Sequence, residues 1–298
     1  MGMKPAVLFF AAAALCALAS FANRASPYVG ALSADAKTGR VLFEANADAE
    51  AYPASVTKLM TLLLVLEDVE AGRYALTDSI CATDDATRLS EPSWVDFRPG
   101  EKMTVDDLLL ALMVKSANDA AVALGVNSAG SFDAFVARMN ERAGELGMTH
   151  TRYYNPNGLP PVSRVNGRVR RYPWKSFNVT TCRDQLKLAL ELVKKPQVFK
   201  YTSQKIGAVT DGRGQKLTFV NHNNVMVKNK QKIVNPDGTE AVDGLKTGYI
   251  DAGGSSIVLT GRRGSARAVV VVLGSNSARE RDDTAAHLLS DALSALSW

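Results

Sequence analysis

Residues 242–274 read VDGLKTGYIDAGGSSIVLTGRRGSARAVVVVLG, and they carry the main signal for the fold class. Three runs within this segment, residues 242–250, 254–261 and 267–274, have the apolar and β-branched composition that is typical of strands. Short turns that contain Gly separate the runs. The segment therefore predicts three neighbouring β-strands.

Two further strand-like runs lie near the start of the chain, at residues 28–35 (YVGALSAD) and 40–46 (RVLFEAN). The intervening AKTG is typical of a hairpin turn. This hairpin can join the three late strands in one antiparallel sheet, with helices on its faces and a helical lobe built from the middle of the sequence. The expected fold class is α+β.

The segments between the two groups of strands have mainly helical patterns. Helices are expected at residues 51–67, at 104–125 with a break at 116–118, at 131–147 and at 180–195. Thr104 and Ser131 are the expected N-caps of two of them. Residues 148–180, rich in Pro, Gly, Asn and Arg, are expected to be mostly loop. A last helix is expected at Ala278–Leu296.

One lysine stands out in the first helical segment, AYPASVTKLMTLLLVLE (residues 51–67). A helix that is apolar on all faces is normally buried, and a buried ammonium group is costly unless it is paired or loses its proton. Ser55 and Lys58 are three residues apart and share a helix face. A neutral Lys58 could take the hydroxyl proton of Ser55 and make it a nucleophile. The alternative is that Ser55 caps the helix and Lys58 reaches solvent.

Composition places the chain among ordinary globular proteins. It has 298 residues, 46% hydrophobic and 22% charged, enough for one large domain or two smaller ones. The net charge is +5, but Lys and Arg are scattered and do not indicate nucleic-acid binding. Residues 163–176 are the densest basic stretch. We expect a solvated loop there, although an anionic polymer could also be attracted to it.

The first 26 residues have the pattern of a secretory signal peptide: a lysine, an apolar run at 6–18, then small residues. Cleavage is expected after Ala22, with Ala19 as an alternative, so residues 1–22 form the signal and 23–298 the mature domain. An uncleaved anchor is the alternative, with at most loose membrane association. The sequence thus predicts export across the inner membrane, to the periplasm or the cell wall.

Cysteine and histidine usage gives no sign of a metal or cofactor. Cys81 and Cys182 remain after signal removal, and they can form a disulfide or stay as free thiols. The three histidines are far apart in sequence, and no HExxH or CxxC motif occurs. No metal and no cofactor are therefore expected.

Three short motifs carry the chemistry: SVTK at residues 55–58, SAN at 116–118 and KTG at 246–248. A second KTG, at 37–39, lies in the expected hairpin turn, where its lysine is solvated. The later copy opens a strand-like run, which can aim Lys246 into a cleft while Gly248 lets a substrate backbone approach closely. We therefore expect the later copy to be functional.

The order and spacing of these motifs resemble those of penicillin-binding proteins and serine β-lactamases. The flanking PASVTKLMT, SANDAAVALG, NPNGL, DGLKTGYIDAGG and SARE narrow the resemblance to the low-molecular-mass D-alanyl-D-alanine carboxypeptidases, over residues 28–298. The resemblance implies a transpeptidase or β-lactamase-like fold. It also implies an enzyme that removes the terminal D-alanine from peptidoglycan stem peptides and that β-lactam antibiotics inhibit covalently.

The resemblance also implies roles for individual residues. Ser55 is the nucleophile that forms the acyl-enzyme, and Lys58 is the general base. Ser116 bridges the two lysines and can relay a proton to the leaving D-alanine. Substrate-binding roles fall on Asn118, Lys246, Thr247, Gly248, Tyr249 and Arg279. The backbone N–H groups of Ser55 and Tyr249 would form the oxyanion hole.

Several positions depart from the family pattern. Tyr249 stands where a histidine often follows KTG, and His222 stands where many members have an arginine ahead of it. Arg279 falls on a family arginine near the carboxylate pocket. The basic loop at 160–175 is longer than usual, and we expect residues 23–298 to form the catalytic domain without the C-terminal β-domain that is common in the family.

Three rival functions remain. An endopeptidase that cuts D-Ala cross-links would use the same site. A class A β-lactamase needs a glutamate between SxN and KTG to activate water, but no Glu lies between Glu145 and Glu191 in the expected window. A catalytically dead wall-binding protein would be expected to have lost Ser55 or Lys58, and both are present.

Overall fold

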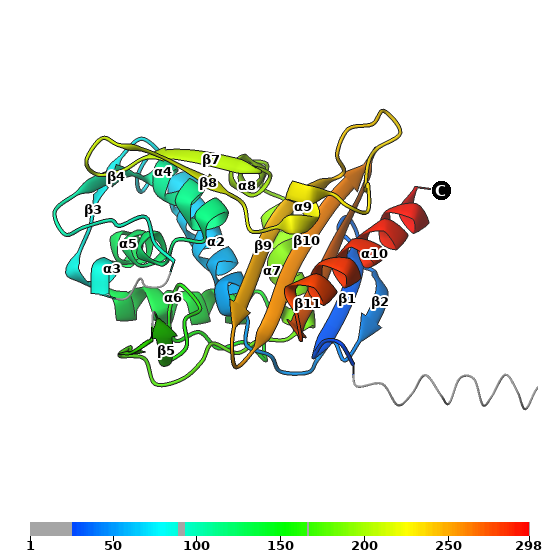
Figure 1. The fold of residues 1–298 in the computed structure, drawn as a ribbon, viewed down its shortest axis with the longest axis horizontal. Helices are drawn as coiled ribbons and strands as arrows, with labels where there is room; N and C mark the ends of the chain where they lie inside the picture. The colour runs from blue at the N-terminus through cyan, green and yellow to red at the C-terminus, as the bar shows by residue number, and fades with distance from the viewer. Residues whose placement is uncertain (1–25, 89–92, 166, 298) are drawn as a thin grey trace, which may run out of the picture.

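The computed structural model describes residues 26–88, 93–165 and 167–297. The predicted signal peptide, residues 1–22, lies outside the described residues. A five-stranded antiparallel sheet has the order β2-β1-β11-β10-β9 and sits beside a helical lobe (Figure 1). Its strands are β1 (Gly30–Asp35), β2 (Val41–Ala45), β9 (Val242–Ile250), β10 (Gly254–Arg263) and β11 (Ala266–Ser275). The predicted α+β class and the joining of the early hairpin to the three late strands are confirmed.

Alternate side chains of the strands fill two separate cores, as the two-residue repeat of a strand requires. Val270 and Val272 of β11 pack with Leu289 and Leu293 of α10 (Ala278–Leu296), which crosses one face of the sheet (Figure 1). Residues 269, 271 and 273 of the same strand face the helical lobe. The run of four valines is therefore a strand buried on both faces.

The helical lobe packs on the other face of the sheet. It is centred on α2 (Lys58–Glu70), in which every residue from Lys58 to Leu66 is buried. Around α2 lie α3 (Asp84–Arg88), α4 (Val105–Leu110), α5 (Asn118–Ala129), α6 (Phe132–Glu145) and α7 (Cys182–Val193). The N-caps predicted for α4 and α6 are confirmed, because Thr104 and Ser131 each accept a hydrogen bond from a backbone N–H three residues on.

Three two-stranded sheets and two short helices complete the fold. The sheets pair β3 (Ser79–Cys81) with β4 (Lys102–Thr104), β5 (Val162–Val165) with β6 (Arg168–Arg171), and β7 (Ile206–Thr210) with β8 (Lys216–Val220). The helices α8 (Gln197–Thr202) and α9 (Asn224–Lys228) flank β7 and β8 in the chain. The hairpin β5–β6 replaces part of the loop that the sequence predicted at 160–175.

The two remaining cysteines do not form a disulfide: Cys81 is exposed and Cys182 is buried, and both are free thiols. In the part of the chain that the structure describes, no single helix is long and apolar enough to cross a membrane. One sharply bent pair, α5 with α6, meets that requirement only when the two are taken together.

Candidate active site

Ser55 lies in a tight turn at the entrance to α2. Residues Ala54–Thr57 form a single 3₁₀ turn, and α2 begins directly afterwards at Lys58. Side chains three residues apart eclipse one another in 3₁₀ geometry, so Ser55 and Lys58 point the same way. Lys58 Nζ lies 2.9 Å from Ser55 Oγ. Ser55 does not act as a helix cap here, which removes the alternative reading of this pair.

Lys58 is fully buried and has two further polar neighbours. Its Nζ donates to the side-chain oxygen of Asn118 and to the backbone carbonyl of Asn157, each at 2.7 Å. Both of these partners are carbonyl oxygens, which only accept. A neutral amine has two N–H donors and one lone pair. In the charged form Nζ also donates to Ser55 Oγ, whereas in the neutral form the two carbonyls take both donors and the lone pair can accept from the Ser55 hydroxyl.

The electrostatics of the site favour that neutral form. Burial, followed by the positive charge of Lys246, lowers the pKa of Lys58 well below its ordinary value, while the carboxylate of Asp119 acts in the opposite direction. Burial is the largest cause because it removes the water that stabilises an ammonium ion. A neutral Lys58 in this position can chemically accept a proton from Ser55.

The carbonyl of Asn157 is held by a small scaffold of asparagines. The side-chain oxygen of Asn155 accepts from the N–H groups of Asn157 and Gly158, and Asn178 donates both to Asn155 O and to Thr57 Oγ1. Gly158 has a φ of +85°, and a Cβ there would overlap the carbonyl oxygen of Ala54. Residues 155–158 therefore pack directly against the turn that holds Ser55.

Ser116 and Asn118 reach the site from a break between two helices. A π-helical turn, Ala111–Lys115, ends at Ser116, whose φ of 61° stops the helix, and α5 starts afresh at Asn118. The break predicted from sequence at 116–118 is confirmed. It turns the side chain of Asn118 toward Lys58, and Ser116 lines the same cleft. The relay role of Ser116 stays a prediction.

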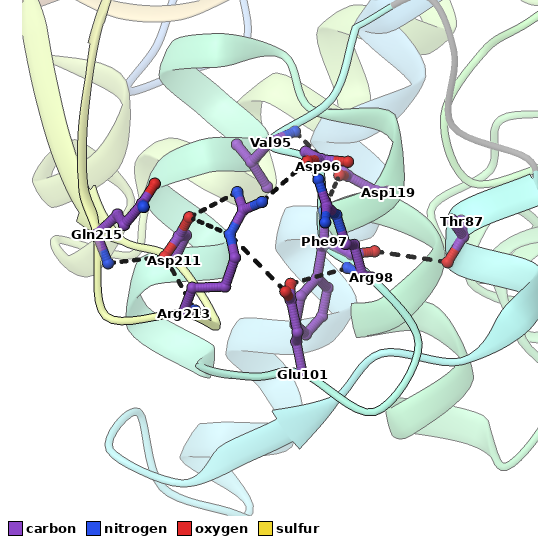
Figure 2. Close-up of polar contacts among 10 residues, drawn as sticks. All are labelled: Thr87, Val95, Asp96, Phe97, Arg98, Glu101, Asp119, Asp211, Arg213 and Gln215. Carbon is purple, nitrogen blue, oxygen red and sulfur yellow. Dashed lines mark hydrogen bonds and ion pairs between the residues drawn. The ribbon is translucent and has the colours of Figure 1, made fainter.

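The wall beside this break is fixed by Asp119. Its buried carboxylate accepts from the backbone N–H groups of Val95 and Phe97, at 2.9 and 3.1 Å (Figure 2). Burial raises the pKa of Asp119 to about 6, and the backbone hydrogen bonds oppose that rise. The same segment places Ser93, whose carbonyl accepts from the N–H of Asn118 at 2.6 Å. Asp119, the residue next to Asn118, thereby positions one side of the cleft.

The hairpin β7–β8 is tied to the same wall. Arg213, in its turn, pairs with Asp211 at 2.8 Å and reaches Asp96 at 3.2 Å (Figure 2). Residues Val220 and Asn221, at the other end of the hairpin, line the cleft. Sequence patterns did not identify this hairpin.

The opposite wall is β9, the edge strand that carries the second KTG motif. Lys246 is buried and donates to the carbonyl of Thr247 at 3.0 Å. Burial, with a contribution from Arg281, lowers the pKa of Lys246 to about 7. A Cβ on Gly248 would lie 2.6 Å from Pro53 O and 3.0 Å from Ser55 N. Gly248 thus lets β9 press against the turn of Ser55, and its predicted role of admitting a substrate backbone stays a prediction.

These walls enclose a cleft of about 600 Å³. Ser55, Ser116, Asn118, Thr247, Gly248 and Tyr249 line it, together with Ser93, Leu159, Val220, Asn221, His222, Asn224, Ala278 and Arg281. No Asp or Glu is among these lining residues. Within the described residues there is also no group of three or more His, Cys, Asp or Glu that could hold a metal ion.

Comparison with known proteins explains this arrangement. The family model described as D-alanyl-D-alanine carboxypeptidase matches residues 25–277. The chain belongs to this family. D-alanyl-D-alanine carboxypeptidase DacF of Bacillus subtilis is 30% identical over 86% of the chain and 60% of the relative. A D-alanyl-D-alanine endopeptidase of Pseudomonas aeruginosa is 28% identical over 77% of the chain and 65% of the relative. The chain thus spans about three fifths of the length of the curated relatives it matches.

A solved structure shares the fold of this family member. Penicillin-binding protein D2 of Listeria monocytogenes, in its ampicillin-bound form, superimposes with a TM-score of 0.70 at 28% identity. The match covers 89% of this chain and 98% of the other. The predicted penicillin-binding-protein fold is therefore confirmed.

One predicted site residue of this family member lies elsewhere. Arg279 is 91% exposed and pairs with Asp283 at 3.6 Å, outside the cleft. Arg281 lines the cleft instead, with only 5% of its side chain exposed. Successive helix residues are about 100° apart, so Ala278 and Arg281 share the face that looks into the cleft and Arg279 does not. The sequence indicated an arginine at the start of this helix, but it could not show which face of the helix turns toward the cleft.

His222 also lines the cleft, at the end near Lys246. Desolvation within the cleft, then the charges of Lys246 and Lys115, lower the pKa of His222 to about 4, although part of its ring is open to solvent. A neutral ring can donate or accept a hydrogen bond. A contact between His222 and the substrate stays a prediction.

Proposed function

We propose that this chain is a serine D-alanyl-D-alanine carboxypeptidase that removes the terminal D-alanine from peptidoglycan stem peptides. The observation that carries the proposal is the contact set of Lys58. Two carbonyl acceptors and full burial leave its lone pair facing Ser55 Oγ at 2.9 Å. A serine with such a base beside it is a nucleophile for acyl transfer.

Acylation follows from this placement. Ser55 Oγ attacks the carbonyl between the two terminal D-alanines while Lys58 takes its proton. The N–H groups of Ser55 and Tyr249 receive the developing oxyanion, since Gly248 brings the two backbones together. The amide C–N bond then breaks, and the leaving D-alanine receives the proton by way of Ser116.

The charges of the cleft set the direction of the substrate. Thr247 and Arg281, which line the cleft, and the buried Lys246 beside them would hold the terminal carboxylate, because Lys246 and Arg281 bring positive charge to this end of the cleft. A groove of about 430 Å³, lined by apolar residues of β5–β6 and the end of β9, adjoins the other end and shares Leu159 and Tyr249 with the cleft. It would take the acyl side of the peptide.

β-Lactam antibiotics would acylate Ser55 in the same way, and the acyl group that they leave on Ser55 would be hydrolysed slowly. Deacylation needs a base for water, and the residues lining the cleft include no Asp or Glu. Lys58 would have to serve again. This observation also disfavours a class A β-lactamase.

The cross-link endopeptidase is the second candidate. It uses the same Ser55 and Lys58, and one relative bears that name. The choice depends on the leaving group, which is a single D-alanine in one reaction and a whole stem peptide in the other.

The expected location is the periplasm or the cell wall, after export through the signal sequence at residues 1–22. Peptidoglycan is built and trimmed there, which agrees with the proposed substrate.

The test is to incubate the protein with a purified pentapeptide muropeptide and with a cross-linked dimer, and to weigh the products. Loss of one alanine from the pentapeptide is expected, and Ser55→Ala is the control. Unchanged pentapeptide, with an active family enzyme run in parallel, would refute the proposal.

A further inference from the structure

The wall of the cleft beside residues 116–118 is built from two segments. The first, residues 93–101, begins with Ser93, which lines the cleft. The second is the hairpin β7–β8, whose end at residues 220–222 also lines the cleft. Both segments lie outside the five-stranded sheet, so the hydrogen bonds of that sheet do not fix them. Their relative position depends on the contacts that they make with each other and with the helices.

The helix α5 holds the first segment on its inner side. The buried carboxylate of Asp119 accepts from the N–H groups of Val95 and Phe97, at 2.9 and 3.1 Å. Asp96, between them, has a φ of 58°, a left-handed conformation that Asp and Asn adopt more often than most residues with a side chain. Its own carboxylate is 38% exposed and accepts from Arg98, in the same segment, at 2.7 Å. Asp96 is therefore open to a further partner on the outer side.

That partner is Arg213, in the turn of the hairpin β7–β8 (Figure 2). Its Nη1 donates to Asp96 Oδ2 at 3.2 Å, and its Nε lies 3.8 Å from Glu101 Oε1. A Cβ on the preceding residue, Gly212, would overlap the side chain of Glu101, so the turn and the first segment are in direct contact. We call Asp96, Glu101, Asp211 and Arg213 the clasp.

The guanidinium of Arg213 is not needed to form its own turn. Asp211 Oδ1 accepts from the backbone N–H groups of Arg213 and Gln215, at 3.0 and 2.8 Å. The backbone N–H of Asp211 also donates to the carbonyl of Gln215 at 2.9 Å. These three bonds close the turn through the backbone and Asp211 alone. The guanidinium, which also holds Asp211 Oδ2, therefore adds a link from this turn to the first segment.

The rest of the hairpin lies close to the residues that carry the chemistry. The π turn Ala111–Lys115 directly precedes Ser116. The ammonium group of Lys115 lies 5.6 Å from the ring centre of Phe219 on β8, within the range of a cation–π contact. The chain then continues into residues 220–222 of the cleft lining. A shift of the hairpin would therefore disturb both this lining and the approach to Ser116.

We propose that Arg213 is a positioning residue for the reaction at Ser55: by joining the hairpin β7–β8 to residues 93–101, it holds the two segments of the wall in the arrangement that receives substrate. The inference rests on the proposed function. Arg213 itself is not among the residues that line the cleft, so it acts through Ser93 and residues 220–222.

The expected effect is modest, because the clasp is partly open to solvent. Arg213 is 32% exposed and Asp96 38% exposed, and ion pairs at such positions are individually weak. Loss of the clasp should change the affinity for substrate by about threefold. The apparent affinity for a ligand falls with the fraction of the protein that is ready to receive it. KM should therefore rise, while kcat stays the same because saturating substrate selects the closed wall.

The experiment compares Arg213→Gln, Asp96→Asn and the variant with both changes. Asn also suits the left-handed conformation at position 96, so Asp96→Asn removes the charge without straining the backbone. Arg213→Lys keeps the charge but loses the planar guanidinium. The control is Arg142→Gln: Arg142 pairs with Glu67 and Glu145, each at 2.8 Å, is 22% exposed and does not line the cleft.

Three quantities are measured on each variant: KM and kcat with the pentapeptide muropeptide, the second-order rate of acylation by a penicillin, and the free energy of unfolding. The last shows that the comparison is made on folded protein. If Arg213→Gln did not fold, Asp96→Asn and Arg213→Lys would carry the test.

We expect Arg213→Gln and Asp96→Asn each to raise KM about threefold with kcat unchanged, and to slow acylation by the same factor. The double variant should be no worse than either single variant, because both changes break one contact. Arg213→Lys should recover part of the loss. The difference from the wild-type chain should shrink as salt is raised, since salt screens partly exposed charges. Arg142→Gln should change neither KM nor the acylation rate.

Other results would overturn the inference. These are an unchanged KM in Arg213→Gln, effects that multiply in the double variant, an equal effect of Arg142→Gln, or Arg213→Lys no better than Arg213→Gln. Acylation by penicillin without release of D-alanine would refute the proposed function alone, and the acylation rates would still decide on the clasp. A wild-type chain that is neither acylated nor active on the pentapeptide would overturn both.

Discussion

At the scale of single residues, the proposed reaction gives two buried lysines opposite tasks. In that reaction, Lys58 must be neutral to take a proton, whereas Lys246 must be charged to hold a carboxylate. The structure separates them by their surroundings. Lys58 is enclosed by two carbonyl acceptors and a hydroxyl, while Lys246 has the carbonyl of Thr247 as its partner.

The first prediction concerns pH. The value of kcat/KM reports groups of the free enzyme. It should fall at low pH as Lys58 gains a proton, and fall again as pH rises through about 7, where Lys246 loses its proton. A substrate whose terminal carboxylate is replaced by a carboxamide should be slower and should lack the alkaline fall. An alkaline fall of the same size with both substrates would contradict the role of Lys246.

The second prediction compares the two KTG motifs. Lys246→Ala removes a charged partner of the carboxylate and should lower kcat/KM by about 10- to 100-fold. Lys37→Ala should have no effect, because Lys37 lies in the exposed turn between β1 and β2, where its N–H donates to Asp35. Rates of D-alanine release from the pentapeptide measure both. Similar losses would mean that Lys246 does not bind substrate.

The third prediction uses the arginine pair on α10. Arg281→Ala should raise KM for the pentapeptide by roughly 10-fold, as expected for the loss of a charged hydrogen-bond partner. Arg279→Ala should leave KM for that substrate unchanged, since its side chain is 91% exposed outside the cleft. Steady-state kinetics with the pentapeptide measure KM for both variants. A larger effect at Arg279 would restore the role that sequence assigned to it.

At the scale of elements, the site exists because three segments meet tightly: the turn before α2, the break before α5 and the edge strand β9. Gly248 lies so close to the turn of Ser55 that a side chain there would collide with backbone atoms.

The fourth prediction is that Gly248→Ala lowers the free energy of unfolding by about 1–3 kcal/mol, the usual cost of overpacking, and slows acylation of Ser55. The matched control is Gly144→Ala in α6, where a Cβ would meet nothing within 4 Å. That change should raise the free energy of unfolding by about 0.5–1 kcal/mol, because Ala has less chain entropy to lose in a helix. Denaturant unfolding and penicillin acylation rates are the measurements. If Gly248→Ala changed neither the free energy of unfolding nor the acylation rate, β9 would have to be able to move away from the turn at this point.

Sequence predicted the elements whose signals are local. β10 and β11 have apolar, β-branched runs, and Thr104 and Ser131 cap helices through contacts only three residues away. It missed β7–β8, because Ile206 and Val220 are exposed and short strands leave little pattern. It also missed the carbonyl of Asn157 as a partner of Lys58, since a backbone group has no signature in the sequence.

At the scale of the whole molecule, the reaction centre lies where the sheet meets the helical lobe. β9 comes from the sheet, Ser55 and Lys58 from the start of the central helix, and Ser116 and Asn118 from the lobe. The motifs are up to about 190 residues apart in the chain, so their meeting is a property of the fold. Their order along the sequence indicated the chemistry, but only the packed molecule shows how Lys58 is held.

The final prediction tests the central claim, that Lys58 activates Ser55 as the nucleophile. A labelled penicillin should bind covalently, and peptide mapping should place the label on Ser55 alone. Lys58→Ala should slow the labelling by roughly 100- to 10,000-fold, the usual contribution of a general base. Mass spectrometry over time should show a long-lived adduct with the full mass of the drug. Label on another residue, or unchanged labelling in Lys58→Ala, would contradict the account.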